Sequence, residues 1–236
     1  MDPAASIVIL TGAGISAESG LPTYRGAGGL WENHRFEDLA SPRKFSRNPD
    51  LVHRFYNHRR AQLAEVQPNA AHLALAELER SWPGSFLLVT QNVDNLHERA
   101  GSSKVIHMHG ELAKIRCVHC GLVSTWEGDV SRATPCPSCG KADSLRPDVV
   151  WFGEYPYGLD RIRERLKDCS LFVSIGTSGN VYPAAGLIGM VRPAAHTLEI
   201  NLEASEVTSR FKEHRCGKAT ERVPEWVREL LAGVHP

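Results

Sequence analysis

The segment at residues 6–20 constrains the fold of this chain more than any other. Residues 7–10 are all aliphatic and pass directly into a glycine-rich turn. A continuous apolar run of this kind is typical of a parallel strand that is buried on both faces. Gly12, Gly14 and Ala17 have the G-x-G-x-x-G/A spacing, in which glycines bring backbone N–H groups close to a pyrophosphate. Any tight strand-to-helix turn favours glycine, so the motif alone indicates a dinucleotide site without establishing one.

Three further segments predict strands of the same sheet, at residues 86–89, 171–175 and 197–203. Their alternation with helical patterns is typical of a doubly wound parallel sheet, in which ligands bind at the carboxyl ends of the strands. Small and polar residues follow these strands. Gln91, Asn92 and Asp94 are therefore candidates for the same crevice as the glycine turn. Asp94 or Asn95 alternatively caps a helix that begins at Leu96.

The loop after the glycine turn is expected to cover the bound ligand. Pro22 and the glycines within residues 26–29 exclude a long helix at this point. The loop contains two aromatic residues and a cation, Tyr24, Arg25 and Trp31, which suit a ribose or a nicotinamide ring. Arg25 alternatively bonds the carbonyl groups of its own loop.

The predicted helix at residues 51–66 carries a charge within its apolar face. When residues are projected at about 100° each, Arg59 falls in the middle of an apolar stripe, whereas Arg54, Asn57 and His58 face away from it. An arginine keeps its charge, so a buried one needs an anionic partner or a hydrated cavity. That partner is either a ligand or an acid of the protein itself.

Two histidines, His107 and His109, stand in the short predicted strand at residues 105–110, which ends in a glycine. A single histidine is more often structural than catalytic. Two of them beside the expected crevice make a catalytic role for one a realistic alternative.

Two Cys-x-x-Cys pairs predict a structural zinc site. Cys117 and Cys120 are separated by fifteen residues from Cys136 and Cys139, which is the spacing of a zinc ribbon. Four thiolates complete a tetrahedral site and leave no position for a catalytic water. The metal is therefore expected to hold structure and to take no part in chemistry.

The expected fold class is α/β, with a Rossmann-like doubly wound parallel sheet and a smaller domain made of a helical module and a zinc-ribbon module. We expect the dinucleotide-binding domain to comprise residues 1–32, 83–112 and 153–236. The helical module is expected at residues 33–82 and the zinc-binding module at residues 113–152.

The charge balance and the cysteine pattern limit the partners. The chain has 27 basic and 27 acidic residues, so it offers no overall attraction to nucleic acid or to an anionic membrane. Its apolar runs fall far short of the ~20 residues needed to span a bilayer. Four of the six cysteines form the metal pattern, so we expect a reducing, cytoplasmic setting. We also expect a monomer.

Taken together, these motifs closely resemble those of the sirtuins, NAD-dependent protein-lysine deacylases, over essentially the whole chain. The segments that carry the resemblance are 12–16, 23–26, 90–94, His109-Gly110, the four cysteines, 149–154, 176–178 and Asn201. One departure is Tyr24, where the family usually has phenylalanine.

The resemblance implies that NAD is consumed as a co-substrate. In the family, the acyl oxygen of a modified lysine attacks C1′ of the nicotinamide ribose, nicotinamide leaves, and the acyl group ends on ADP-ribose. His109 would be the general base, Asn92 would hold a water beside the ribose, and Asp94 would hold the carboxamide. The other residues implied for the NAD site are Gly12, Ala13, Gly14, Ser16, Ala17, Tyr24, Arg25, Trp31, Gln91, Gly176, Thr177, Ser178, Asn201, Leu202, Glu203 and Ala219.

The resemblance also suggests a substrate. Tyr56-x-x-Arg59 looks like the motif of class III sirtuins, which remove succinyl and malonyl groups, and Ala40 matches a small residue that leaves room for the longer chain. Residues Val150, Phe152, Gly153 and Glu154 resemble the edge that pairs with an acylated-lysine protein substrate. We therefore expect a desuccinylase and demalonylase with weaker deacetylase activity. The alternatives are a deacetylase, a mono-ADP-ribosyltransferase and a catalytically silent NAD-binding adaptor.

Overall fold

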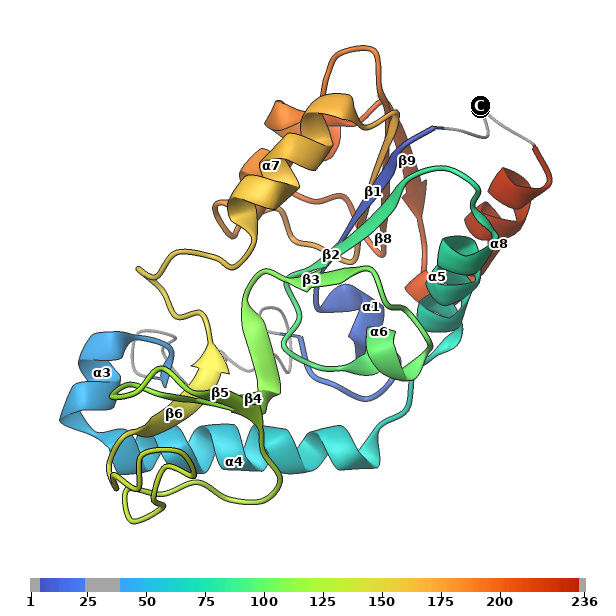
Figure 1. Ribbon diagram of the computed structural model, residues 1–236. Coiled ribbons are helices and arrows are strands. Elements are labelled where there is room, and N and C mark those ends of the chain that lie inside the picture. The colour runs from blue at the N-terminus through green and yellow to red at the C-terminus, as the bar shows by residue number, and fades with distance from the viewer. Residues whose placement is uncertain (1–4, 24–38, 234–236) are drawn as a thin grey trace.

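A six-stranded, entirely parallel sheet forms the centre of the protein. The computed structural model describes residues 5–23 and 39–233 (Figure 1). The strands lie in the order β3-β2-β1-β7-β8-β9, which is the strand order of a Rossmann-like sheet. The predicted fold class is therefore confirmed. The strand bounds are β1 Ile7–Thr11, β2 Phe86–Thr90, β3 Val105–His107, β7 Leu171–Ile175, β8 His196–Asn201 and β9 Glu213–Cys216.

Both faces of this sheet are covered, which explains why its central strands are apolar throughout. Along β1, Ile7 and Ile9 point to one cluster of buried side chains, whereas Val8 and Leu10 point to another. Helices α5 (Ala70–Ser81) and α8 (Ala219–Leu231) pack on the first face, and α7 (Leu159–Asp168) and the 3-10 helix η1 (Ala184–Met190) pack on the second (Figure 1).

Helix α5 belongs to the core of the parallel sheet. Its residues Leu75 and Leu78 are completely buried in the same cluster as Ile7 and Val223 of α8. This moves the expected end of the helical module from residue 82 to the connection between α4 and α5. Periodicity identifies α5 as a helix, but it does not indicate which sheet the apolar face of that helix contacts.

A smaller antiparallel sheet lies beside the first, in the order β5-β4-β6. The long helix α4 contributes Val52 and Leu63 to a cluster shared with Leu112 of β4 and Val149 of β6. The remaining elements are α1 Gly14–Ala17, α3 Pro42–Arg47, α4 Pro49–Glu65, α6 Leu96–Arg99, β4 Gly110–Cys117, β5 Val123–Thr125, β6 Leu145–Val149 and η2 Thr208–Arg210.

The chain leaves the parallel sheet twice, between β1 and β2 and between β3 and β7, to build these smaller parts. Each excursion starts at the carboxyl end of a strand, β1 or β3, and a helix, α5 or α7, then returns the chain to the amino end of β2 or β7 (Figure 1). The glycine turn after β1 therefore faces α4 and the small sheet across a crevice between the two parts.

Candidate functional site

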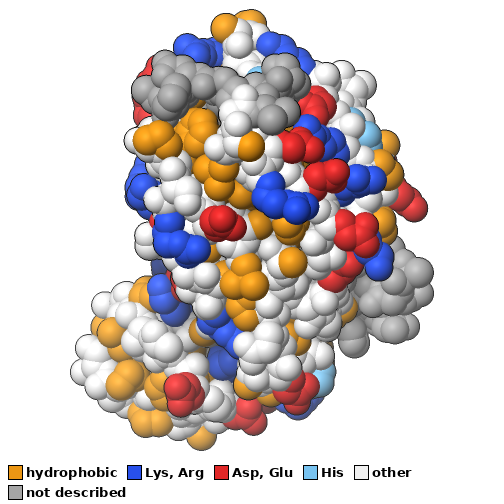
Figure 2. Space-filling view, turned by 90° about the vertical axis from the view of Figure 1, so that its right-hand side faces the viewer, with side chains coloured by type: hydrophobic (Ala, Val, Ile, Leu, Met, Phe, Trp, Pro, Cys, Tyr) orange, Lys and Arg blue, Asp and Glu red, His pale blue; other side chains and the backbone are white. Residues whose placement is uncertain are grey.

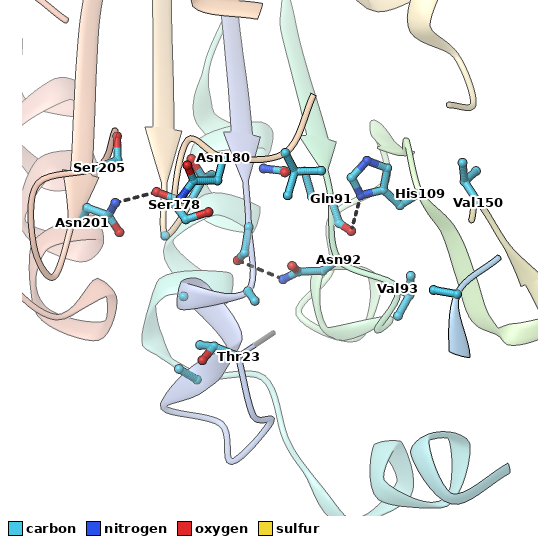
Figure 3. Close-up of a pocket in the computed structure, with 18 of the residues that line it drawn as sticks. Thr23, Gln91, Asn92, Val93, His109, Val150, Ser178, Asn180, Asn201 and Ser205 are labelled. Atoms are coloured by element: carbon cyan, nitrogen blue, oxygen red, sulfur yellow. Dashed lines mark hydrogen bonds between the residues drawn. The ribbon is translucent and has the colours of Figure 1, made fainter. Parts of the chain in front are cut away.

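One continuous cavity of about 910 Å³ occupies this crevice. It runs past the carboxyl ends of β1, β2, β7, β8 and β9. Asn201 and Ser205 lie at one end, Asn92 lies in the middle, and His109 and Val150 lie on the opposite side (Figure 3). The predicted site residues that line it are Gly12, Ala13, Gly14, Ala17, Ala40, Tyr56, Arg59, Gln91, Asn92, His109, Val150, Phe152, Gly153, Glu154, Gly176, Thr177, Ser178, Asn201, Leu202, Glu203 and Ala219.

Three other predicted residues, Tyr24, Arg25 and Trp31, lie outside the described residues. The last two, Ser16 and Asp94, line a small recess that adjoins the cavity at Ala13 and Asn92.

The glycines of the first turn also have a structural role within the protein. The N–H of Gly12 donates to the carbonyl of Ile175 (2.9 Å), and the N–H of Gly14 donates to that of Gly176 (2.9 Å). These two groups are therefore already used within the protein. A Cβ at Gly12 would lie 2.7 Å from the oxygen of Gly176, and one at Gly14 would lie 2.7 Å from its Cα. The glycines are required because the turns after β1 and β7 pack backbone against backbone.

A polar cluster behind the glycine turn joins Ser16, Asn92 and Asp94. The Asn92 side-chain amide donates to the carbonyl of Gly12 and to Ser16 Oγ (3.1 Å each), and Ser16 Oγ donates to Asp94 Oδ2 (3.1 Å). Asp94 Oδ1 also accepts from the N–H of Leu96 (3.2 Å), the first residue of α6, which agrees with the capping alternative for Asp94; Asn95 makes no side-chain cap bond. Burial raises the pKa of the Asp94 carboxyl, against the effect of these hydrogen bonds.

His109 is oriented by the backbone of the segment that follows β2. Its Nδ1 lies 3.1 Å from the carbonyl of Gln91, and a carbonyl only accepts, so Nδ1 carries the hydrogen. The lone pair of the neutral ring is then on Nε2. Burial lowers the pKa of His109, and the hydrogen bond to Gln91 opposes this only partly. The ring is therefore a neutral base at the wall of the cavity.

The sequence predicted that His107 and His109 lie on one strand, and this prediction is wrong. Strand β3 ends at His107 and β4 begins at Gly110, so His109 lies in the turn between them. His107 Nδ1 faces the carbonyl of Asn92 (3.1 Å) and its Nε2 faces Glu98 Oε1 (2.7 Å). Burial alone would disfavour its charge, but the hydrogen bond and charge of Glu98 raise the pKa of His107 overall. The carbonyls of Gln91 and Asn92 thus face His109 and His107, whose pKa values are shifted in opposite directions.

The opposite end of the cavity is supported by a buried acid that the sequence did not single out. Glu199 of β8 is 1 % exposed, and it accepts hydrogen bonds from Ser205 and Thr208 and contacts His214 Nδ1 (3.0 Å). These bonds hold the loop after β8, whose Ser205 lines the cavity. Asn201 donates to the carbonyl of Thr177 (2.7 Å) and ties this end to the turn after β7 (Figure 3).

Helix α4 presents Tyr56 and Arg59 to the cavity from one face. Both are buried, each 6 % exposed, and both line the cavity together with Ala40. The adjacent Arg60, which the helical projection did not reveal, is buried for a structural reason. It donates to the carbonyls of Leu112 (3.1 Å) and Gly128 (3.1 Å) and joins α4 to the zinc-binding module.

The same structural role corrects the expectation for Asn57. Its side chain donates to the carbonyl of Val130 (2.9 Å) and accepts from the N–H of Val130 (3.0 Å), so it packs against the zinc-binding module. Arg54 and His58 are exposed, as predicted.

The segment after β6 borders the cavity, and three of its backbone N–H groups already donate hydrogen bonds within the protein. The N–H of Val150 donates to the carbonyl of His109 (2.8 Å), and that of Phe152 donates to the carbonyl of Ala40 (3.0 Å). The N–H of Trp151 donates to Glu154 Oε2 (2.8 Å). A substrate strand added here would therefore pair with carbonyl groups of the segment and not with these three N–H groups.

The four cysteines come together as the spacing predicts. Their sulfur atoms all lie within 4.8 Å of one another. Four Zn–S bonds of about 2.3 Å in a tetrahedron place sulfurs about 3.8 Å apart. The pairs Cys117–Cys139 and Cys120–Cys136 are separated by 3.8 Å and 3.7 Å. The cluster thus fits a structural zinc ion, which would be held entirely by thiolates.

The surface of the protein carries mixed charge. On the face shown in Figure 2, basic and acidic side chains are interspersed with hydrophobic ones. Within residues 5–23 and 39–233, no helix combines the length and hydropathy that a membrane span requires.

The fold and the site define a class of protein: a Rossmann-like dinucleotide-binding protein with an inserted zinc ribbon and a buried cavity between the two parts. Comparison with known sequences makes this assignment specific. The sequence model of the Sir2 family matches residues 12–183. The chain belongs to the Sir2 family.

Relatives and solved structures agree with this assignment. The NAD-dependent protein deacylase of Pasteurella multocida (strain Pm70) is 56% identical over 231 residues, covering 95% of this chain and 97% of that protein. The protein of the same name from Escherichia coli (strain K12) is 55% identical and covers 97% of this chain and 83% of that protein.

Among solved structures, a complex of a Sir2 homologue with NAD has a TM-score of 0.88 at 41% identity, covering 98% of this chain and 91% of that chain. A complex of Sir2 with a p53 peptide and NAD+ has a TM-score of 0.81 at 30% identity, covering 98% and 94%.

Proposed function

We propose that this protein is an NAD-dependent protein-lysine deacylase that prefers acyl groups ending in a carboxylate, such as succinyl and malonyl. The observation that carries the proposal is that Tyr56 and Arg59 line the same cavity as the glycine turn and His109. The curated relatives are named NAD-dependent protein deacylases, which supports the general reaction. The preference for acidic acyl groups rests on the chemistry of this chain's own cavity.

The cavity has a suitable place for each part of NAD. The end with Asn201, Leu202, Glu203 and Ala219 would hold the adenosine, and the turns after β1 and β7 would border the pyrophosphate. When bound, NAD supplies a glycosidic bond whose cleavage makes the ribose carbon accept the acyl oxygen. With one water consumed, the products would be nicotinamide, an acyl ester of ADP-ribose and the free lysine.

The chain's own residues would orient the reactants and move one proton. His109 Nε2 is available to accept a proton from a ribose hydroxyl, because Nδ1 is committed to the carbonyl of Gln91. Asn92 is held by Gly12 and Ser16, so it is preorganised to place a water or a hydroxyl beside the ribose. Asp94 in the adjoining recess would bind the carboxamide.

Arg59 and Tyr56 would recognise the acyl group. A guanidinium binds a carboxylate with two parallel hydrogen bonds, and a phenol hydroxyl adds a third. Because both residues are buried, the pairing would occur largely away from water, where it is stronger. An acetyl group has no atom to reach them, so the difference in transition-state binding would favour the acidic substrate.

The test compares succinyl and acetyl peptides of the same sequence. Arg59→Met should lower kcat/KM for the succinyl peptide by about 100-fold, because removal of one partner of a buried charge pair costs about 2–5 kcal/mol. The acetyl reaction should change far less. Arg54→Met, an exposed position on the same helix, is the matched control. Equal losses on both peptides would refute the specificity, and ADP-ribose attached to protein without acylated ADP-ribose would indicate a transferase.

A further inference from the structure

Trp151 connects the predicted acyl-binding residues to the rest of the fold. It follows β6 and is 2 % exposed, and its indole Nε1 donates a hydrogen bond to Tyr56 Oη at 2.9 Å. An indole N–H is only a donor. The hydroxyl oxygen of Tyr56 is therefore the acceptor in this bond, and the hydroxyl hydrogen points away from the indole. Tyr56 itself lines the cavity beside Arg59.

The indole is held in place from its other side by Arg146. The guanidinium carbon of Arg146 lies 3.5 Å from the centroid of the Trp151 ring, in cation–π geometry. Its two terminal nitrogens donate to Glu154 Oε1 (2.6 Å) and Oε2 (2.9 Å), and one of them also donates to the carbonyl of Val149 (2.7 Å). Glu154 in turn accepts from the backbone N–H of Trp151. The ring and the backbone of Trp151 are thus fixed by one ion pair.

Phe45 of α3 restricts the indole further. Its ring centroid lies 5.3 Å from that of Trp151. Trp151 belongs to the buried cluster that contains Val52 and Tyr56, and Phe45 packs against this cluster. Burial opposes ionisation of Glu154, but the hydrogen bonds from Arg146 and from the Trp151 N–H lower the pKa of Glu154 overall. The ion pair between Arg146 and Glu154 therefore stays charged at neutral pH.

We propose that Trp151 is a positioning residue for acidic acyl groups. By donating to Tyr56 Oη, it directs the hydroxyl hydrogen of Tyr56 toward the carboxylate that Arg59 binds, and Arg146 with Glu154 holds the indole in the orientation that allows this. The inference rests on the proposed function, since it assigns the means by which the same site selects its substrate.

The experiment measures the ratio of kcat/KM for the succinyl peptide to kcat/KM for the acetyl peptide. Trp151→Phe keeps an aromatic ring under Arg146 and removes the N–H, and it should lower the ratio by about 5-fold, the value of one ordinary hydrogen bond. Tyr56→Phe should lower the ratio as well. In the double variant the two losses should not add, because Trp151 acts through the Tyr56 hydroxyl.

A second variant and a control separate this role from a loss of stability. Arg146→Lys keeps the charge but loses the planar stacking and the two-point contact with Glu154, so it should lower the same ratio. Trp82→Phe is the matched control, because the buried indole of Trp82 donates to the carbonyl of Ala5 (2.9 Å) in the core of the parallel sheet. It should lower thermal stability and leave the ratio unchanged.

The outcomes distinguish this proposal from the proposed function. If Arg59→Met changes the ratio but Trp151→Phe and Arg146→Lys do not, the positioning role is wrong and the acidic preference stands. Additive losses in the Trp151→Phe, Tyr56→Phe double variant also overturn it. If Arg59→Met leaves the ratio unchanged, both proposals fail.

Discussion

Gly176 lines the cavity, and one added methyl group there should disturb both the fold and the cavity. It lies at the turn after β7 with a φ of +64°, a conformation that costs an L residue about 1–2 kcal/mol. A Cβ at this position would lie 2.5 Å from the backbone nitrogen of Ile15 and 2.7 Å from the carbonyl carbon of Gly14. Backbone atoms cannot rotate away, so overpacking adds about 1–3 kcal/mol. Gly176→Ala should therefore destabilise the fold by about 2–5 kcal/mol in total.

The control for this prediction is Gly128→Ala. Gly128 has a φ of +77°, and a methyl group added there would meet no atom within 4 Å, so this variant should lose only the conformational part, about 1–2 kcal/mol. Urea titration measures both free energies of unfolding. Gly176→Ala should also raise KM for NAD, because the clash separates the turns after β1 and β7, whereas Gly128→Ala should not. Equal stability losses in the two variants would refute the backbone-to-backbone packing.

Further predictions concern the base and the metal. Burial lowers the pKa of His109 from its ordinary value of 6.5, and a base acts in its neutral form. As the pH falls, kcat/KM should therefore stay constant down to pH 6.5 and decline only in more acidic solution. A decline in kcat/KM centred above pH 6.5 would contradict the buried environment assigned to His109. His109→Tyr should retain the fold and the zinc while turnover is lost, as circular dichroism and a nicotinamide-release assay would show, and an active variant would remove His109 from the reaction. Chelation of zinc should unfold the segment around Cys117 and Cys136. Replacement of zinc by cobalt should leave kcat unchanged, because all four ligands are thiolates and no position is open for a substrate or a water. A change in kcat with cobalt would show that the metal takes part in the chemistry.

The sequence was sufficient where the chemistry depends on residues close together in the chain. The zinc ligands were identified from two Cys-x-x-Cys pairs, since a knuckle is a local turn and needs only its own residues. The run at residues 7–10 predicted a strand buried on both faces, and the structure confirms it. The position of Arg59 on the apolar face of α4 followed from helical geometry alone, because side chains three and four residues apart share a face.

Other features were decided by tertiary contacts. Helix α5 was predicted to belong to a helical module, but its apolar face is buried against α8 and the parallel sheet. Strand β9, Glu213–Cys216, has no apolar pattern and is a strand because it pairs with β8. The contact of the glycine turn with Gly176, which also requires glycines, was not visible in the sequence.

The surroundings of Tyr56 and Arg59, the residues proposed to bind the acyl group, show the same division most clearly. Sequence alone placed Tyr56 and Arg59 on one helix face, and by resemblance gave them a common ligand. It did not indicate Trp151, which lies 95 residues further along the chain and bonds the Tyr56 hydroxyl. Spacing along a helix or a metal knuckle is set by local backbone geometry, so it is visible in the sequence. A hydrogen bond between residues far apart depends on how separate elements pack, and only the folded chain brings those two side chains together.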